Sequence, residues 1–201
     1  KFRTTKIKMK NVFFILSTAR CRSTWFSNLF TYKDSFCYNE ELRYITNWSE
    51  LKEKIEQRPE ANVGFEDPEM LHYVETIYKM FPEAKYVLLE RNRDQAEQSL
   101  INISGADPRT VYDKFDRWHN DLERFLKTIN KFKFIHWDNM DNVEEIKKIW
   151  DYVLPNCEFD QQRWEMLTAM RITVTDGNKP YPIKKDCLSP YFDFNKLKKA
   201  K

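Results

Sequence analysis

Charged and hydroxyl-bearing side chains follow directly after an apolar run near the start of the chain. The run VFFIL is followed by Arg20, Arg22, Ser23 and Thr24, and apolar side chains then recur at helical spacing from Trp25. A loop between a buried strand and the start of a helix presents unpaired backbone N–H groups and the positive end of the helix dipole. With two guanidinium groups added, the loop is expected to bind a phosphate- or sulfate-like anion.

The loop lacks the features of the P-loop found in enzymes that hydrolyse ATP or GTP. That pattern places a Lys directly before its Ser or Thr and approaches it through glycines. Here Arg22 precedes Ser23, and the loop contains no Gly. No Asp-based magnesium site is visible beside the loop in the sequence, so no metal is expected. A small-molecule kinase is therefore the less favoured interpretation of this anion site.

A second anion signal lies further along the chain. The strand-like stretch KYVLL leads into Arg91, and Ser99 follows eight residues later on the next helix. Both side chains could hold one phosphate group if the loop folds Arg91 back over that helix. Arg20, Glu66, Arg91 and Trp137 each lie just past the end of an apolar stretch, and ligands of parallel sheets gather at the carboxyl ends of the strands. The sequence therefore predicts one site at this edge.

Strand-like and helix-like segments alternate along the chain. This alternation predicts an α/β fold of three layers, α/β/α, with a mainly parallel central sheet. The expected strands cover residues 12–17, 35–38, 62–65, 85–89 and 132–136. The expected helices cover residues 23–32, 48–58, 69–80, 94–103, 111–129 and 143–153. We expect a single domain over residues 1–201, with its core at about 11–155 and a C-terminal helix and loop region over 156–201.

The composition limits the class of protein. With 201 residues, of which 41% are hydrophobic, the chain is long and apolar enough for one globular domain. A net charge of +3 indicates no general affinity for nucleic acid, and no apolar run is long enough to span a membrane. The four cysteines are widely spaced and form no metal-ligand pattern, so free thiols and a cytoplasmic location are expected.

Residues 19–25, ARCRSTW, resemble the first motif of the PAPS-dependent sulfotransferases, where PAPS is 3′-phosphoadenosine-5′-phosphosulfate. That motif, Pro-Arg/Lys-Ser-Gly-Thr-Thr-Trp, follows the first strand and binds the 5′-phosphosulfate group, while its Trp stacks on adenine. The resemblance implies a P-loop-type fold, PAPS as the donor and 3′-phosphoadenosine-5′-phosphate (PAP) as the product. The residues of this loop that are implied to bind the donor are Arg20, Cys21, Arg22, Ser23, Thr24 and Trp25.

Two further stretches are similar to motifs of the same family. Arg91 and Ser99 match an Arg at a strand end and a Ser eight residues on, which hold the 3′-phosphate in the family. Residues 134–140, FIHWDNM, are similar to the family's Phe-Tyr-Glu-Asp-Met stretch, which implies that Trp137 contacts the adenine. Together the motifs extend over most of the chain and imply a sulfotransferase.

Residues 37–43, CYNEELR, are similar to the Cys-Gly-Glu-Glu-Thr-Arg segment of the protein-tyrosine sulfotransferases, where the second Glu is the catalytic base. The resemblance implies transfer of a sulfonate group from PAPS to an acceptor hydroxyl or amine, with Glu41 as the general base and Glu40 as the fallback. A Glu partly desolvated in a cleft has a raised pKa and can accept the proton of an attacking hydroxyl. Arg20 and Arg22 would stabilise the charge that develops on the sulfonate.

Two positions depart from the family pattern. Arg22 stands where the family loop has Gly, and it either points at the sulfonate or faces away into an ion pair. Glu66 stands where the tyrosine-sulfating enzymes have a Lys before Asp-Pro, so either Arg20 or Arg22 replaces that Lys or tyrosine specificity is not inherited. A catalytically silent PAP- or PAPS-binding module is the alternative. The sequence leaves open whether the acceptor is a small molecule, a glycan or a peptide, and it is compatible with a homodimer.

Overall fold

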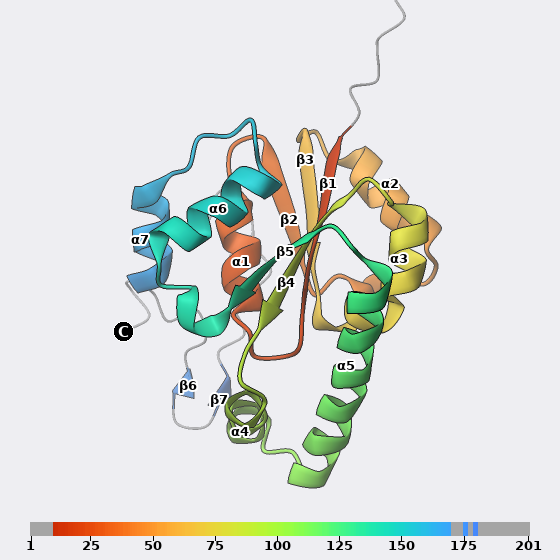
Figure 1. The fold of residues 1–201 in the computed structure, drawn as a ribbon, viewed down its shortest axis with the longest axis vertical. Helices are drawn as coiled ribbons and strands as arrows, with labels where there is room; N and C mark the ends of the chain where they lie inside the picture. Colours follow the sequence, from red (N-terminus) through yellow and green to blue (C-terminus); the bar gives the residue numbers. More distant parts are fainter. Residues whose placement is uncertain (1–9, 170–174, 177–178, 181–201) are drawn as a thin grey trace, which may run out of the picture.

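The computed structural model describes residues 10–169, 175–176 and 179–180. At its centre is a five-stranded sheet in which every neighbouring pair of strands is parallel (Figure 1). Across the sheet the order is β2-β3-β1-β4-β5, and this sheet confirms the predicted fold class. The strands are β1 (Asn11–Ser17), β2 (Ser35–Asn39), β3 (Asn62–Glu66), β4 (Lys85–Glu90) and β5 (Phe132–His136). A separate antiparallel pair consists of β6 (Thr175–Asp176) and β7 (Lys179–Pro180).

Helices cover both faces of the sheet, which gives the predicted three layers (Figure 1). One face carries α1 (Ser23–Phe30), α6 (Val143–Val153) and α7 (Gln161–Ala169). The other face carries α2 (Ser49–Gln57), α3 (Val74–Met80) and α5 (Pro108–Thr128). Helix α4 (Arg93–Ser104) lies beyond the carboxyl end of β4, below the sheet in Figure 1.

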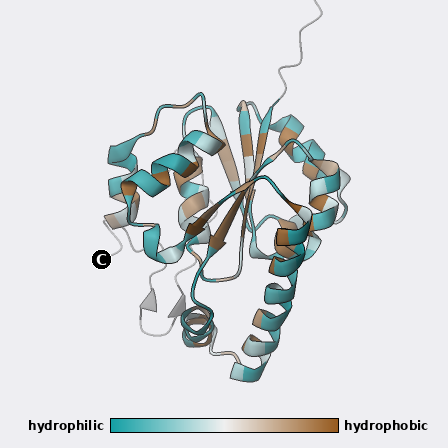
Figure 2. Ribbon diagram, viewed as in Figure 1, coloured by the Kyte–Doolittle hydropathy of each residue, from teal (hydrophilic) through white to brown (hydrophobic). Residues whose placement is uncertain are grey.

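Strand β1 shows that the sheet is buried on both faces. Successive side chains of a strand point to opposite faces, so Phe13 and Ile15 join the core under α1 while Phe14 and Leu16 join the core under α3 and α5. All four side chains are fully buried, which accounts for the continuous apolar run in the sequence. Figure 2 shows the same division in the helices, whose hydrophobic sides face the sheet and whose hydrophilic sides face outward.

The prediction of one helix over 69–80 is wrong in its first half. The chain forms a 3₁₀ helix, η2 (Pro68–Tyr73), before α3 begins. Asp67 caps it by accepting a hydrogen bond from the Glu69 backbone N–H at 2.9 Å. Over so short a segment, apolar periodicity does not distinguish three residues per turn from 3.6. Two further 3₁₀ turns, η1 (Leu42–Tyr44) and η3 (Trp137–Asn139), were not predicted.

The C-terminal region of the predicted domain is only partly described. Helix α7 lies within the predicted region 156–201, of which residues 170–174, 177–178 and 181–201 lie outside the described residues. Cys21, Cys37 and Cys157 are free thiols, as expected, and Cys187 lies outside the described residues. Within the described part of the chain, no helix combines the length and apolar character that crossing a bilayer requires. The single-domain boundaries stay a prediction.

Candidate active site

The loop between β1 and α1 has an unusual backbone for a segment without glycine. Arg20 has φ 69° and Arg22 has φ 59°, both in the left-handed region. Glycine adopts this region freely, and Arg22 stands where the family pattern has Gly. Other residues lose about 1–3 kcal/mol there, and such positions cluster at ligand sites. Arg22 precedes α1, and no side chain among the described residues caps this helix, so the N–H groups of its first turn are available to a ligand.

Two predicted arginines and a predicted serine meet beside this loop. Arg20 Nε donates to Ser99 Oγ on α4 at 3.2 Å, and Arg91 Nη1 donates to the backbone carbonyl of Arg20 at 3.0 Å. The Nε of Arg91 is buried and has no hydrogen-bond partner among the described residues. The structure therefore brings these three residues together, and it leaves a buried guanidinium donor, Arg91 Nε, without a partner among the described residues.

The arginine cluster carries an excess of positive charge. Burial lowers the pKa of Arg20, and the neighbouring charge of Arg91 lowers it further. Burial also lowers the pKa of Arg91, and the charge of Arg22 acts in the same direction, while Cys21 and Asp138 oppose it. A guanidinium group whose pKa is lowered by burial and like charge is stabilised by a nearby negative charge. The cluster is therefore suited to bind an anion.

Trp137, on η3 directly after β5, lies close to two of these arginines. The guanidinium carbons of Arg91 and Arg22 lie 4.1 and 4.5 Å from the centre of the Trp137 ring, as in cation–π contacts. Arg22 also forms an ion pair with Asp141, in which Nη1 and Oδ1 are 2.6 Å apart. Of the two alternatives for Arg22, the structure shows the ion pair.

Two other predicted donor-binding residues lie in the core. Trp25 is 3% exposed and packs edge-on against Phe26, with the ring centres 4.9 Å apart. Cys21 is fully buried, and burial raises the pKa of its thiol to about 11. Only a small part of the Trp25 ring is therefore open to a ligand in this conformation. Adenine stacking by Trp25 stays a prediction, and the partly exposed Trp137 is the aromatic residue beside the arginines.

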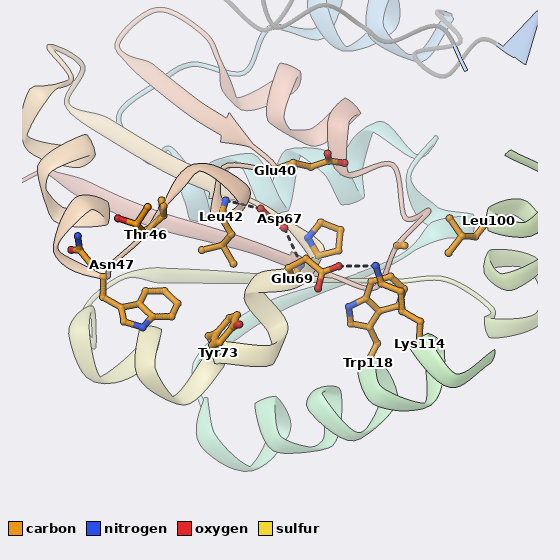
Figure 3. A pocket seen from close by; sticks show the side chains of 14 residues that line it. Glu40, Leu42, Thr46, Asn47, Asp67, Glu69, Tyr73, Leu100, Lys114 and Trp118 are labelled. Atoms are coloured by element: carbon orange, nitrogen blue, oxygen red, sulfur yellow. Dashed lines mark hydrogen bonds and ion pairs between the residues drawn. The ribbon is translucent and has the colours of Figure 1, made fainter. Parts of the chain in front are cut away.

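A cleft of about 570 Å³ lies next to the loop between β1 and α1, which is called the anion loop below (Figure 3). Its lining comes from the segment after β2, from η2 and from the α4 and α5 helices. Three of the lining side chains are the aromatic residues Trp48, Tyr73 and Trp118, and Ala19 of the anion loop also lines it. Aromatic walls with a few polar groups are typical of small-molecule sites. The cleft is therefore a candidate acceptor site adjoining the arginine cluster.

The two predicted carboxylates after β2 point in different directions. Glu40 lines the cleft, and its backbone has a left-handed φ of 50° (Figure 3). Its N–H donates to the backbone carbonyl of Glu66 at 2.7 Å, which ties it to the end of β3. Glu41 is 9% exposed, does not line the cleft, and accepts a hydrogen bond from Lys54 Nζ at 2.8 Å. The fallback carboxylate, rather than the preferred one, therefore faces the cleft.

Two polar residues that line the cleft, Glu69 and Lys114, were not predicted from the sequence. Lys114 Nζ and Glu69 Oε1 form an ion pair at 2.8 Å, drawn as a dashed line in Figure 3. His72 contacts Glu69 through Nε2 at 3.1 Å and the buried Asp121 through Nδ1. Burial lowers the pKa of this imidazole, and the carboxylate of Glu69 opposes the shift. The i, i+4 spacing of Lys114 and Trp118, at the edge of the apolar stripe of α5, is the signal that could have revealed this wall.

Fold and site together define an α/β protein of P-loop type with an arginine-rich loop at the carboxyl edge of its sheet. The chain belongs to the sulfotransferase family, because the sequence profile described as "Sulfotransferase family" matches residues 13–141, more than half of its length. No curated protein sequence matches the chain. Within the described residues, no group of three or more His, Cys, Asp or Glu side chains could hold a metal ion.

Solved sulfotransferase structures have the same fold. A sulfotransferase from Alicyclobacillus acidocaldarius matches with a TM-score of 0.56 at 16% identity, covering 80% of this chain and 90% of that one. The mouse sulfotransferase SULT7A1, crystallised in complex with PAP, matches with a TM-score of 0.56 at 12% identity. That match covers 78% of this chain and 62% of the mouse protein. At these identities the likeness concerns the fold alone.

Proposed function

We propose that this sulfotransferase takes its sulfonate group from PAPS and transfers it to a hydroxyl or amine of an acceptor. The observation that carries the proposal is the arginine cluster at the start of α1, in which Arg91 Nε is buried without a partner among the described residues. Guanidinium groups beside a helix N-terminus suit a ligand with several anionic groups. The mouse protein of similar fold was crystallised with PAP, the bisphosphate that remains after sulfonate transfer from PAPS.

The predicted nucleotide-binding residues divide between two phosphate groups. Ser23 and Thr24, with the N–H groups of the first turn of α1, would hold the 5′-phosphate. Arg91 and Ser99 would hold the 3′-phosphate, because both belong to the cluster built on Arg20. Trp137 would contact the adenine. In this division the unused Arg91 Nε provides the donor that the nucleotide needs.

Arg20 and Arg22 would stabilise the negative charge that develops during sulfonate transfer. PAPS supplies an activated sulfonate group, and the protein binds and orients it while charge develops on the leaving oxygen. Arg22 must first leave Asp141, whose side chain is 62% exposed. An exposed ion pair contributes about 0–1 kcal/mol, so this rearrangement costs little. Cys21 and Trp25 support the loop from the core side.

The acceptor would enter the cleft and lose its proton to a carboxylate after β2. Glu40 is the preferred base in this proposal because it lines the cleft. Glu41, the base implied by the resemblance, would position the segment through its ion pair with Lys54. A base within reach of the attacking hydroxyl typically contributes a rate factor of about 10²–10⁴.

Isothermal titration with PAP, and separately with ATP, tests the choice of nucleotide. We expect PAP to bind and ATP to bind far more weakly, because the second arginine signal is arranged for a 3′-phosphate. Tight binding of ATP without binding of PAP would favour the small-molecule kinase and contradict the proposal.

Transfer of labelled sulfate from PAPS to a panel of hydroxyl and amine acceptors separates an enzyme from a binding module. Two observations favour the silent module as the second candidate: the acid Glu66 replaces the family's Lys, and Glu41 is held by Lys54. We expect labelled product with at least one acceptor class. PAP binding with no transfer to any acceptor would support the silent module instead.

A further inference from the structure

Glu66 is an unusual carboxyl group beneath the anion loop. It ends β3, is fully buried, and neither of its carboxyl oxygens has a hydrogen-bond partner among the described residues. The hydroxyl of Ser17, at the end of β1, is buried and unpartnered in the same way. Buried polar groups are normally hydrogen-bonded, because an unmade bond costs the full desolvation penalty. Two buried polar groups without hydrogen-bond partners, at adjacent strand ends, therefore indicate a site whose hydrogen bonds are completed when a ligand binds.

No cation among the described residues compensates the charge of Glu66. The hydroxyls of Ser17 on β1 and Ser23 on α1 lie near enough to act on the carboxyl, although neither makes a hydrogen bond of normal geometry with it. The titratable groups that face it are Asp67 on its own segment, Cys21 on the loop and Cys37 on β2. Burial first, and the charge of Asp67 second, raise the pKa of Glu66 well above its usual range. Burial of a carboxyl group that has no hydrogen-bond partner among the described residues also disfavours its charged form, so the geometry and the direction of the pKa shift both favour the neutral form.

We propose that Glu66 is a positioning residue. Its neutral carboxyl O–H donates a hydrogen bond to the Ser23 hydroxyl oxygen, and the Ser23 O–H then donates a hydrogen bond to a phosphate bound on the loop. The inference rests on the proposed function, since it takes that phosphate to belong to the nucleotide. A hydroxyl both donates and accepts and rotates to suit its partners. An ionised Glu66 would instead accept the Ser23 hydrogen and place a negative charge directly beneath the anion.

A thermodynamic cycle on PAP affinity at pH 7 tests the link between the two residues. Glu66→Gln keeps an N–H donor, Glu66→Met removes it, and Ser23→Ala removes the relay. We expect Glu66→Gln to bind PAP within about twofold of the native protein, and Glu66→Met and Ser23→Ala each to bind about five- to tenfold more weakly, as for one lost hydrogen bond. The double variant Glu66→Met/Ser23→Ala should bind no more weakly than Ser23→Ala alone.

Two outcomes of the cycle would overturn the inference. One is native PAP affinity in Glu66→Met, and the other is multiplication of the two single effects in the double variant. If the native protein binds PAP and either outcome is found, the proposed function stands and only the role of Glu66 fails. If the native protein does not bind PAP at all, both fail together. Circular dichroism establishes that each variant is folded, and Glu66→Leu replaces Glu66→Met if that variant is not.

Infrared difference spectra at pH 7 test the protonation state directly and need no ligand. Subtraction of the Glu66→Gln spectrum from that of the native protein should reveal the carbonyl band of a protonated carboxyl. Glu60→Gln is the matched control, because Glu60 is also buried, at 9% exposed, but pairs with Arg58 at 2.5 Å. It should show only carboxylate bands. Absence of the protonated band at Glu66 would overturn the inference whatever the cycle shows.

Discussion

The anion loop and the cleft, which lie side by side at the carboxyl edge of the sheet, differ in how their charged groups are paired. On the loop side, Arg20 and Arg91 lie together, and one guanidinium donor has no partner among the described residues. On the cleft side, Lys114 is paired with Glu69, and aromatic rings form much of the wall. A cluster with excess positive charge selects a ligand by its negative charge. A wall of aromatic rings whose charged groups are paired selects a ligand by its shape. The difference explains why the donor is indicated by charge and motif while the acceptor is not.

The largest effect is expected for Arg91→Ala. PAP affinity should fall about a hundredfold or more, because removing one partner of a desolvated charge contact costs about 2–5 kcal/mol. Isothermal titration measures this loss. Lys114→Met, which removes a cation of the cleft, should leave PAP affinity unchanged, as should Lys127→Ala, whose side chain is 78% exposed. Equal losses in Arg91→Ala and Lys114→Met would abolish the distinction between the two sides.

The parts of the molecule that could be predicted from the sequence depend on simple periodicities. The apolar run of β1 and the spacing of Val111, Phe115, Trp118 and Phe125 in α5 reflect burial, which the order of residues records directly. Arg20, Arg91 and Trp137 could be grouped because all strands of the five-stranded sheet are parallel, so that their carboxyl ends share one edge. Ser99 could be linked to Arg91 by its spacing of eight residues.

The cleft could not be predicted, because it depends on backbone geometry and on packing between distant segments. Glu40 turns into the cleft through a φ of 50°, which a non-glycine residue rarely adopts and which the sequence does not reveal. The 3₁₀ winding of η2 sets the position of Glu69, and Lys114 comes from a helix far along the chain. Fold resemblance likewise does not identify an acceptor.

A second prediction separates the two carboxylates after β2. Glu40→Gln should lower kcat for sulfonate transfer about a hundredfold and leave PAP affinity within twofold, because the substitution removes only the proton acceptor. The neighbouring Glu41→Gln is the matched control and should lower kcat by less than about fivefold, the effect of loosening one partly exposed ion pair. The reverse order would make Glu41 the base, as the resemblance implies. No loss in either variant would place the base elsewhere in the cleft.

The third prediction concerns the pH dependence of stability. The pKa of an unfolded Glu is about 4.5, and burial raises the pKa of Glu66 well above this value in the folded protein, so the folded protein holds this proton to a higher pH. The stability that this carboxyl contributes is therefore full below about 4.5 and is lost as pH rises toward the folded pKa, by up to about 1.4 kcal/mol per pH unit. Urea unfolding from pH 5 to 8 should show this decline for the native protein relative to Glu66→Gln.

Glu60→Gln is the control for that experiment, because the pKa of Glu60 is shifted in the opposite direction from that of Glu66. Burial would raise the pKa of Glu60, but its hydrogen bond with Arg58 lowers it overall. The stability from Glu60 is therefore present above its usual pKa and lost only as pH falls through the lowered value. Between pH 5 and 8, the difference between the native protein and Glu60→Gln should be constant. Parallel curves for Glu66→Gln and Glu60→Gln would show that Glu66 does not hold its proton.

The smallest effect is expected for Arg22→Gly. The substitution removes an ion pair with an exposed partner, worth about 0–1 kcal/mol, and relieves a left-handed backbone that costs about 1–3 kcal/mol. The free energy of unfolding should therefore change by less than about 2 kcal/mol and PAP affinity should fall about three- to tenfold. Arg22→Ala loses the same contacts but keeps the strained backbone, so it should be less stable than Arg22→Gly. Thermal denaturation ranks the two variants, and the opposite ranking would show that the backbone at this position is not strained.

The position of Trp137 gives the site an optical signal of its own. Emission from an indole ring depends on the charges around it, and two guanidinium groups lie 4.1 and 4.5 Å from this one. An anion that draws those groups toward itself changes the emission of one tryptophan among the six in the chain. Occupancy of the arginine cluster can therefore be followed by fluorescence, with no label attached to the protein or to the ligand.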